Sequence, residues 1–195
     1  VTWYGRSKLA AEQVLQGLAG AGSGRLPVTI VRPAAVYGPR DKDFHAYFRA
    51  IKLRLNLQLG QDERHVSLIH VCDLVDLLVR ALEQEQAVGQ IYFGCGPATT
   101  YAELAKAIAM VLDRQPVRIN VPLALLGPMA TVATAKGRLT GRPALLNDQR
   151  LVEVRQRSWL FSGEKARREL GFEARYDLET GVRETVEWYR REGWL

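Results

Sequence analysis

Apolar residues fall near helical spacing in two long segments of the chain, one towards each end. In residues 4–18 the leucines and a valine follow this spacing, and adjacent alanines favour a helix. In residues 178–189 the apolar positions share one helical face, and Asp177 stands where a side chain caps the first turn. The pattern therefore predicts a helix over each segment.

Between these helices, short runs rich in β-branched residues alternate with further helical segments. The runs predict strands over residues 28–31, 67–71, 90–93 and 117–121. Helices are expected over residues 48–57, 74–83, 100–112, 123–135 and 162–171. Thr100 and Glu103 form a capping box, and we expect Asp73 and Ser162 to cap their helices. Strands that alternate with helices predict an α/β fold with a mainly parallel sheet.

The composition is that of an ordinary globular protein, with 47% hydrophobic and 25% charged residues in a chain of 195. This length accommodates one large domain, or a domain with a small appendage. Lysine and arginine outnumber aspartate and glutamate by 27 to 21, which favours anions such as phosphates. The most basic window, residues 150–168, also holds Glu153 and Glu164 and lacks regularly placed aromatics. We therefore expect no nucleic-acid partner.

Cysteine content and hydropathy bear on the compartment in which the protein works. Cys72 and Cys95 are too few and too far apart for a disulfide scaffold or a zinc site. The most apolar stretch, residues 121–135, contains two prolines and is shorter than the roughly 20 residues that a membrane span needs. The chain opens without the pattern of a signal peptide. We expect free thiols, no metal, no membrane span and a cytoplasmic location.

The sequence Gly20-Ala21-Gly22-Ser23-Gly24 invites comparison with a dinucleotide-binding loop. That loop follows a strand and opens a helix, so that amides at the helix start hold the pyrophosphate. Here the segment follows a helix, and Arg25 stands where the third glycine belongs. We interpret the segment as a helix terminator and loop.

Tyr4 and Lys8 lie one turn apart on the same face of the first predicted helix. A phenol ionises near pH 10, and a nearby ammonium favours the phenolate, which makes such a pair a usable proton carrier. Tyrosine and lysine at this spacing also occur as an ordinary amphipathic pair. The spacing alone leaves both interpretations open.

Several segments in a fixed order surround this pair. They are YGRSK (4–8) with Ala11 and Glu12, VRPAAVYGPR (31–40), IHVCDL (69–74), YFGCG (92–96), and a tail with KA (165–166), ELGF (169–172) and residues 181–189. Together they resemble the C-terminal part of an extended short-chain dehydrogenase/reductase of the NAD-dependent epimerase/dehydratase type, over nearly the whole chain.

The resemblance implies a fold and a domain division. The fold is the C-terminal part of a Rossmann-like, mainly parallel, doubly wound sheet plus a small α/β substrate-binding domain. Residues 1–114 would complete the dinucleotide-binding domain, with about 40–66 contributing to the substrate side. Residues 115–195 would be mainly the substrate-binding domain. A homodimer is plausible in such a family.

The resemblance also implies roles for residues. Tyr4 would be the catalytic acid/base, and Lys8 would hold the nicotinamide ribose of NAD or NADP. The backbone after the next strand would border the nicotinamide, at Pro33, Ala34, Ala35 and Val36. Arg64 is a candidate for a substrate phosphate, although its neighbours depart from the usual epimerase arrangement. His70 is expected to be a packed strand residue.

The implied enzyme acts on a secondary alcohol or ketone of a small-molecule substrate, either a nucleotide sugar or a hydrophobic, hydroxysteroid-like compound. Its outcome would be oxidation, epimerisation or dehydration. A catalytically silent NAD(P)-binding sensor or scaffold of the same fold is the alternative. The family's glycine-rich loop and catalytic Ser or Thr do not occur in these 195 residues. We therefore expect this chain to be part of a longer enzyme, to be inactive alone and to bind nicotinamide cofactors weakly.

Overall fold

The structure is a computed structural model that describes residues 2–19, 26–60, 63–128, 131, 156 and 158–195. Its named helices are α1 (Trp3–Leu18), α2 (Asp43–Lys52), α3 (Val71–Glu83), α4 (Tyr101–Leu112), α7 (Glu164–Leu170) and α8 (Leu178–Arg191), with a 3-10 turn at Glu85–Ala87. Its strands are β1 (Ile30–Pro33), β2 (Ala35–Tyr37), β3 (Leu55–Leu59), β4 (His65–His70), β5 (Ile91–Gly94), β6 (Ala98–Thr100), β7 (Val117–Val121) and β8 (Ser158–Trp159).

The strands pair mainly in parallel. β1 pairs with β5, β2 with β4, β4 with β8 and β3 with β7, all in parallel. Of the strand pairs in the described residues, only β4–β6 is antiparallel. β1 and β2 are separated by Ala34 alone, so one extended segment changes partner from β5 to β4 at that residue. The predicted α/β class with a mainly parallel sheet is confirmed.

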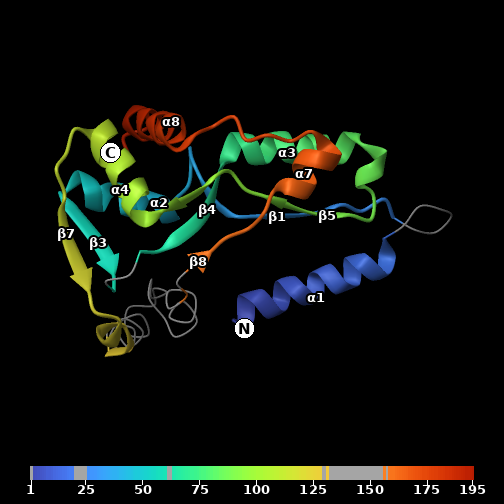
Figure 1. The fold of residues 1–195 in the computed structure, drawn as a ribbon, viewed down its shortest axis with the longest axis horizontal. Coiled ribbons are helices and arrows are strands. Elements are labelled where there is room, and N and C mark those ends of the chain that lie inside the picture. The colour runs from blue at the N-terminus through green and yellow to red at the C-terminus, as the bar shows by residue number, and fades with distance from the viewer. Residues whose placement is uncertain (1, 20–25, 61–62, 129–130, 132–155, 157) are drawn as a thin grey trace.

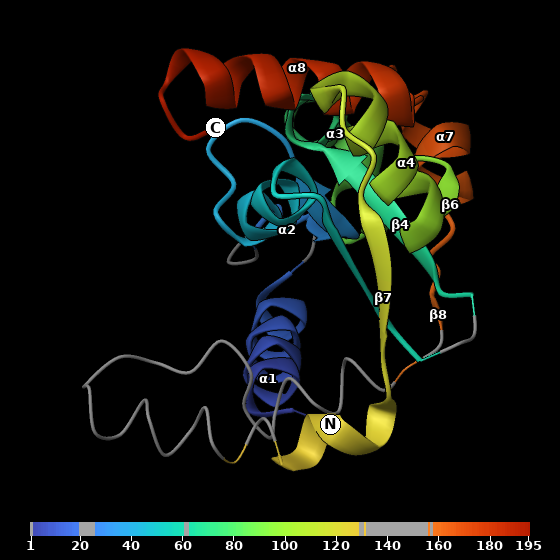
Figure 2. The same cartoon turned by 90° about the vertical axis from the view of Figure 1, so that its left-hand side faces the viewer.

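Helices cover both faces of the β1–β5 pair. α3 and α7 lie on one side of these strands and α1 on the other (Figure 1). The view turned by 90° shows α1 apart from the layer that α2, α4 and α8 form (Figure 2). This arrangement places α1 beside the sheet without embedding it in the rest of the molecule.

Two hydrophobic cores meet at β4 because successive side chains of a strand point to opposite faces. Val66 and Leu68 enter a core with α2, α4 and α8. Ile69 enters a second core with α3, β5 and α7. β4 therefore joins the two halves of the described structure.

The prediction of a helix over residues 48–57 is wrong in its second half. α2 ends at Lys52, and Arg54 adopts a left-handed backbone with φ of 65°. The chain then enters β3, which pairs with β7 along its whole length. The leucines at 55 and 57 alternate with polar residues, the period of a strand rather than of a helix.

The prediction that Asp73 caps a helix starting at Leu74 is also wrong. α3 begins at Val71, and the Nδ1 atom of His70 accepts a hydrogen bond from the Cys72 amide at 3.4 Å. Asp73 is 1% exposed and instead accepts bonds from the Arg175 and Tyr176 amides, both at 3.1 Å. Its carboxylate therefore fastens the chain before α8 to α3.

Other predicted caps are confirmed or nearly so. Thr100 and Glu103 form the capping box of α4, and Asp177 caps α8. The N-cap of α7 is Gly163 rather than Ser162, although the Ser162 hydroxyl accepts a bond from the Glu164 amide. The glycines at 20–24, part of the helix expected over 123–135 and most of the basic window lie outside the described residues. No described helix is long and apolar enough to span a membrane.

Candidate functional site

The first site element is the N-terminal turn of α1, which carries Tyr4 and Lys8. Thr2 caps this helix by accepting a hydrogen bond from the Gly5 amide at 3.1 Å. The Lys8 ammonium lies 5.6 Å from the centroid of the Tyr4 ring. Tyr4 is 68% exposed, so a ligand can approach its hydroxyl. The structure thus brings together the two residues that the sequence singled out.

The next turn of α1 carries Glu12, which is bound to β1. Arg32 donates from Nε to both carboxylate oxygens of Glu12, at 3.0 and 3.1 Å, and from Nη2 to Oε2. These hydrogen bonds hold the pKa of Glu12 below its ordinary value and raise that of Arg32. Because Arg32 precedes Pro33, this ion pair brings α1 to the carboxyl end of β1.

The predicted cofactor-binding residues lie at that carboxyl end. Pro33 is the exposed last residue of β1, and the Ala34 amide donates to the carbonyl of Gly94 at 2.8 Å. Ala35 and Val36 then pair with Leu68 and Ile69. Open α/β sheets bind ligands outside the carboxyl ends of their strands, so this placement fits a nicotinamide-bordering segment.

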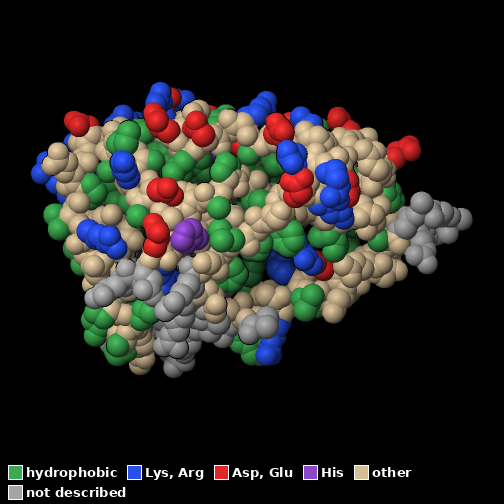
Figure 3. All heavy atoms as spheres, in the orientation of Figure 1, with side chains coloured by type: hydrophobic (Ala, Val, Ile, Leu, Met, Phe, Trp, Pro, Cys, Tyr) green, Lys and Arg blue, Asp and Glu red, His purple; other side chains and the backbone are tan. Residues whose placement is uncertain are grey.

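An aromatic stack lies next to Arg32 of the Glu12–Arg32 ion pair. The guanidinium of Arg32 lies 5.5 Å from the centroid of the Phe93 ring. Phe93 in turn stacks on Phe161, with centroids 5.3 Å apart and an interplanar angle of 16°. Figure 3 shows a hollow on this face, between the N-terminal helix and the layer above it, with hydrophobic and basic side chains inside.

Arg64 and His70 take other places. The carbonyl of Arg64 accepts a hydrogen bond from the Tyr101 amide, at the start of α4. The role of Arg64 in binding substrate stays a prediction. His70 is 1% exposed and stacks on Tyr176 at 4.0 Å, which confirms it as a packed residue.

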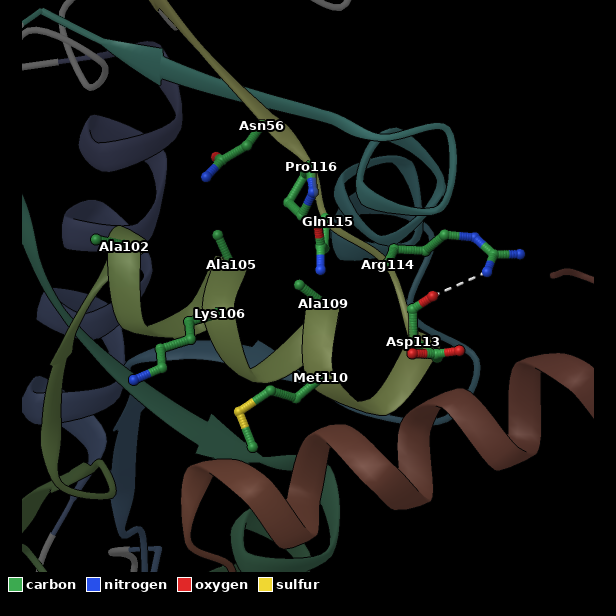
Figure 4. A pocket seen from close by; sticks show the side chains of 10 residues that line it. All are labelled: Asn56, Ala102, Ala105, Lys106, Ala109, Met110, Asp113, Arg114, Gln115 and Pro116. Carbon is green, nitrogen blue, oxygen red and sulfur yellow. Dashed lines mark hydrogen bonds between the residues drawn. The ribbon is translucent and has the colours of Figure 1, made fainter.

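Two further hollows lie away from the Tyr4–Lys8 pair. A shallow groove of about 460 Å³ runs along α4, with Lys106, Asp113 and Arg114 on its rim and alanines on its floor (Figure 4). A second cavity, of about 350 Å³, lies between β4, β6 and the residues before α8. Neither contains Tyr4 or Lys8. Within the described ranges, no group of three or more His, Cys, Asp or Glu residues is placed to hold a metal ion.

Glu12, Arg32 and Phe93 are site residues that the sequence pattern did not predict. Glu12 follows Tyr4 and Lys8 at the same four-residue interval, so all three share one face of α1. That interval was a usable signal for Glu12. Nothing in the local sequence indicates that its partner lies on the following strand.

Comparisons with known proteins agree with this architecture. Residues 1–93 match the model of the NAD dependent epimerase/dehydratase family. A UDP-glucose 4-epimerase of Vibrio cholerae is 33% identical over 71% of this chain and 43% of its own length. A decarboxylating sterol-4-alpha-carboxylate 3-dehydrogenase of Candida albicans is 25% identical over 97% of this chain and 57% of its own length.

A solved structure shows the same fold. The dTDP-glucose 4,6-dehydratase of Bacillus anthracis, in complex with NAD, aligns with a TM-score of 0.69 and 20% identity, over 100% of this chain and 54% of that chain. The chain spans about half the length of the curated relatives it matches. The Rossmann-like fold and the ordered motifs place this chain in the NAD-dependent epimerase/dehydratase family.

Proposed function

We propose that this chain supplies the proton-transfer residues of an NAD(P)-dependent enzyme that acts on a secondary alcohol or ketone. The observation that carries the proposal is the Lys8 ammonium beside the exposed ring of Tyr4. A cation there would stabilise the negative charge that develops on the hydroxyl oxygen as its proton is transferred. The Tyr4 hydroxyl would give a proton to a substrate carbonyl oxygen, or take one from a hydroxyl.

The fit of a nicotinamide cofactor rests on the end of β1. Pro33 is exposed there, next to the Arg32–Glu12 pair that ties down α1. Pro33, Ala34, Ala35 and Val36 would border the nicotinamide, and Lys8 would hold its ribose. When bound, the cofactor would supply or accept the hydride.

Two substrate classes are consistent with the chain. The relatives include an enzyme named for a UDP-sugar and one named for a sterol. The positive charge of the chain favours a diphosphate, whereas the apolar residues from 123 onward favour a hydrophobic compound. We propose residues 115–195 as the main substrate side, joined to residues 40–66 by the β3–β7 pair. Assaying the enzyme with a nucleotide sugar and with a hydrophobic alcohol, each with NAD or NADP, shows which substrate class it uses.

Tyr4→Phe tests the proposal in the active enzyme. Removing the hydroxyl should lower kcat by about 10²- to 10⁴-fold, the usual contribution of a general acid or base. The affinity for cofactor should remain, because the ring and Lys8 are kept. Unchanged turnover would refute the role of Tyr4. Absence of turnover in the wild-type enzyme with every substrate would favour a silent sensor or scaffold.

We further propose that residues 1–195 alone are inactive and bind NAD(H) or NADP(H) weakly. The support is that a glycine-rich phosphate loop does not occur in this sequence. Fluorescence titration of the isolated chain with each cofactor tests this. Tight binding would show that these residues hold the cofactor without such a loop.

A further inference from the structure

Within the described residues, the helix that carries Tyr4 and Lys8 is not held by apolar packing. Every residue of α1 is described, and none is buried. Leu9, Val14 and Leu18 are each about half exposed or more. In the part of the chain that the structure describes, the position of α1 relative to the sheet therefore depends on polar contacts.

The Glu12–Arg32 pair is such a contact, and its geometry is restrictive. A guanidinium that binds both oxygens of a carboxylate fixes orientation as well as distance. Glu12 is only 19% exposed in its side chain, so solvent screens this pair less than a fully exposed one. The contact therefore restrains both the distance of α1 from β1 and its rotation.

Arg32 is itself held from the other side. Its guanidinium lies over Phe93, and Phe93 stacks on Phe161. Phe161 is anchored by its amide, which donates to the Ser67 hydroxyl at 3.1 Å, and by its carbonyl, which accepts from the Cys95 thiol at 3.4 Å. The stack thus connects the ion pair to β4 and β5, which belong to the packed body of the molecule.

From these contacts we infer that Arg32 and Glu12 are positioning residues that set the place of the Tyr4 hydroxyl and the Lys8 ammonium against the carboxyl end of β1. This inference rests on the proposed function, because it assigns the pair a task in the reaction of Tyr4. Glu12 lies one helical turn from Lys8 and two turns from Tyr4, so a rotation of α1 at Glu12 displaces both groups. A displacement of about 1 Å at a reacting centre can lower the rate by about 10²-fold.

A double-mutant cycle in the active enzyme tests the inference. Arg32→Lys keeps the charge and removes the fork, and Glu12→Gln keeps the shape and removes the charge. Each should lower kcat by about tenfold or more. The double variant should be little worse than either single variant, because both remove one interaction. Arg167→Lys makes the same change in a more exposed pair, with Glu164 on α7, and should leave kcat unchanged.

Hydrogen exchange of the 195-residue chain provides a readout that does not depend on activity. Arg32→Lys should speed the exchange of α1 amides by at least about threefold and leave α8 amides unchanged. The inference is overturned if both single variants keep kcat within about threefold of wild type, if their effects add, or if α1 exchange stays the same. If Tyr4→Phe has no effect on turnover, the proposed function fails instead. The exchange result then still decides whether the pair positions α1.

Discussion

The Lys8 ammonium lies 5.6 Å from the ring centroid of Tyr4, whose side chain is open to solvent. Other tyrosines of the chain contrast with this arrangement. Burial raises the pKa of Tyr37 and of Tyr189 well above the ordinary value of a phenol. Those buried phenols are poorly suited to transfer protons near neutrality. Tyr4 is accessible and has a cation next to it.

Lys8→Met should lower kcat at pH 7 by about 10²-fold, because it removes the ammonium that lies beside the proton-transferring side chain. It should also weaken cofactor binding, unlike Tyr4→Phe. Steady-state kinetics with varied cofactor concentration measure both effects. Lys106→Met, on the groove of α4, is the matched control and should change neither. Equal turnover in the Lys8 and Lys106 variants would contradict the assignment.

Asp73→Ala should destabilise the fold by about 3 kcal/mol. The change leaves the amides of Arg175 and Tyr176 without their charged acceptor, and a hydrogen bond to a charged group contributes about 1.5–3 kcal/mol. Urea unfolding of the 195-residue chain measures the loss. Asp76→Asn, which breaks an i,i+4 pair with Arg80, should cost less than about 1 kcal/mol. A similar cost for both variants would show that the Asp73 contacts add little.

The free energy of unfolding should decrease as the pH is lowered, because His70 is buried in its neutral form. Burial lowers the pKa of this imidazole, against the opposing effect of the Glu184 and Asp73 carboxylates. Its Nδ1 atom must stay unprotonated to accept from the Cys72 amide. The unfolded chain therefore takes up a proton first, near pH 6.5, and the stability present above that value is lost as pH falls through the folded pKa.

His70→Asn tests this dependence, because asparagine caps helices well and does not titrate in this range. Urea unfolding at pH 7 and pH 5 should show a smaller loss of stability in the variant than in the wild type. The variant will be less stable at both values, since it loses the stacking on Tyr176. Parallel losses in the two proteins would assign the acid sensitivity to other groups.

Gly181→Ala should destabilise the chain by about 1–3 kcal/mol, the usual cost of overpacking. A Cβ atom at Gly181 would collide with the hydroxyl oxygen of Tyr37 and lie 2.9 Å from its Cζ atom. Gly17→Ala is the control, because nothing lies within 4 Å of a Cβ atom there. It should stabilise α1 by about 0.5–1 kcal/mol. Thermal unfolding of both variants shows whether the two changes have opposite signs.

Local pattern was sufficient for much of the fold and for part of the site. The periodic segments became α1 and α8, and β7 has the predicted bounds, 117–121. The proximity of Tyr4 and Lys8 follows from their four-residue spacing on a helix. The family of the chain was accessible through the order of its motifs, although each motif alone is modest.

The features that the sequence did not reveal depend on contacts between distant residues or on backbone conformation. Asp73 has its partners about a hundred positions further along the chain, so its local position suggested a cap. The end of α2 depends on the left-handed conformation of Arg54. The link from Glu12 to Arg32 requires knowledge of how α1 lies against β1.

The change of partner at Ala34 has a mechanical consequence. Pro33, which would border the nicotinamide, and Tyr37, which enters the core with α2, α4 and α8, belong to one continuous extended segment. With no loop between β1 and β2, the backbone at Pro33 and the Tyr37 side chain in that core are held in a fixed relation to each other.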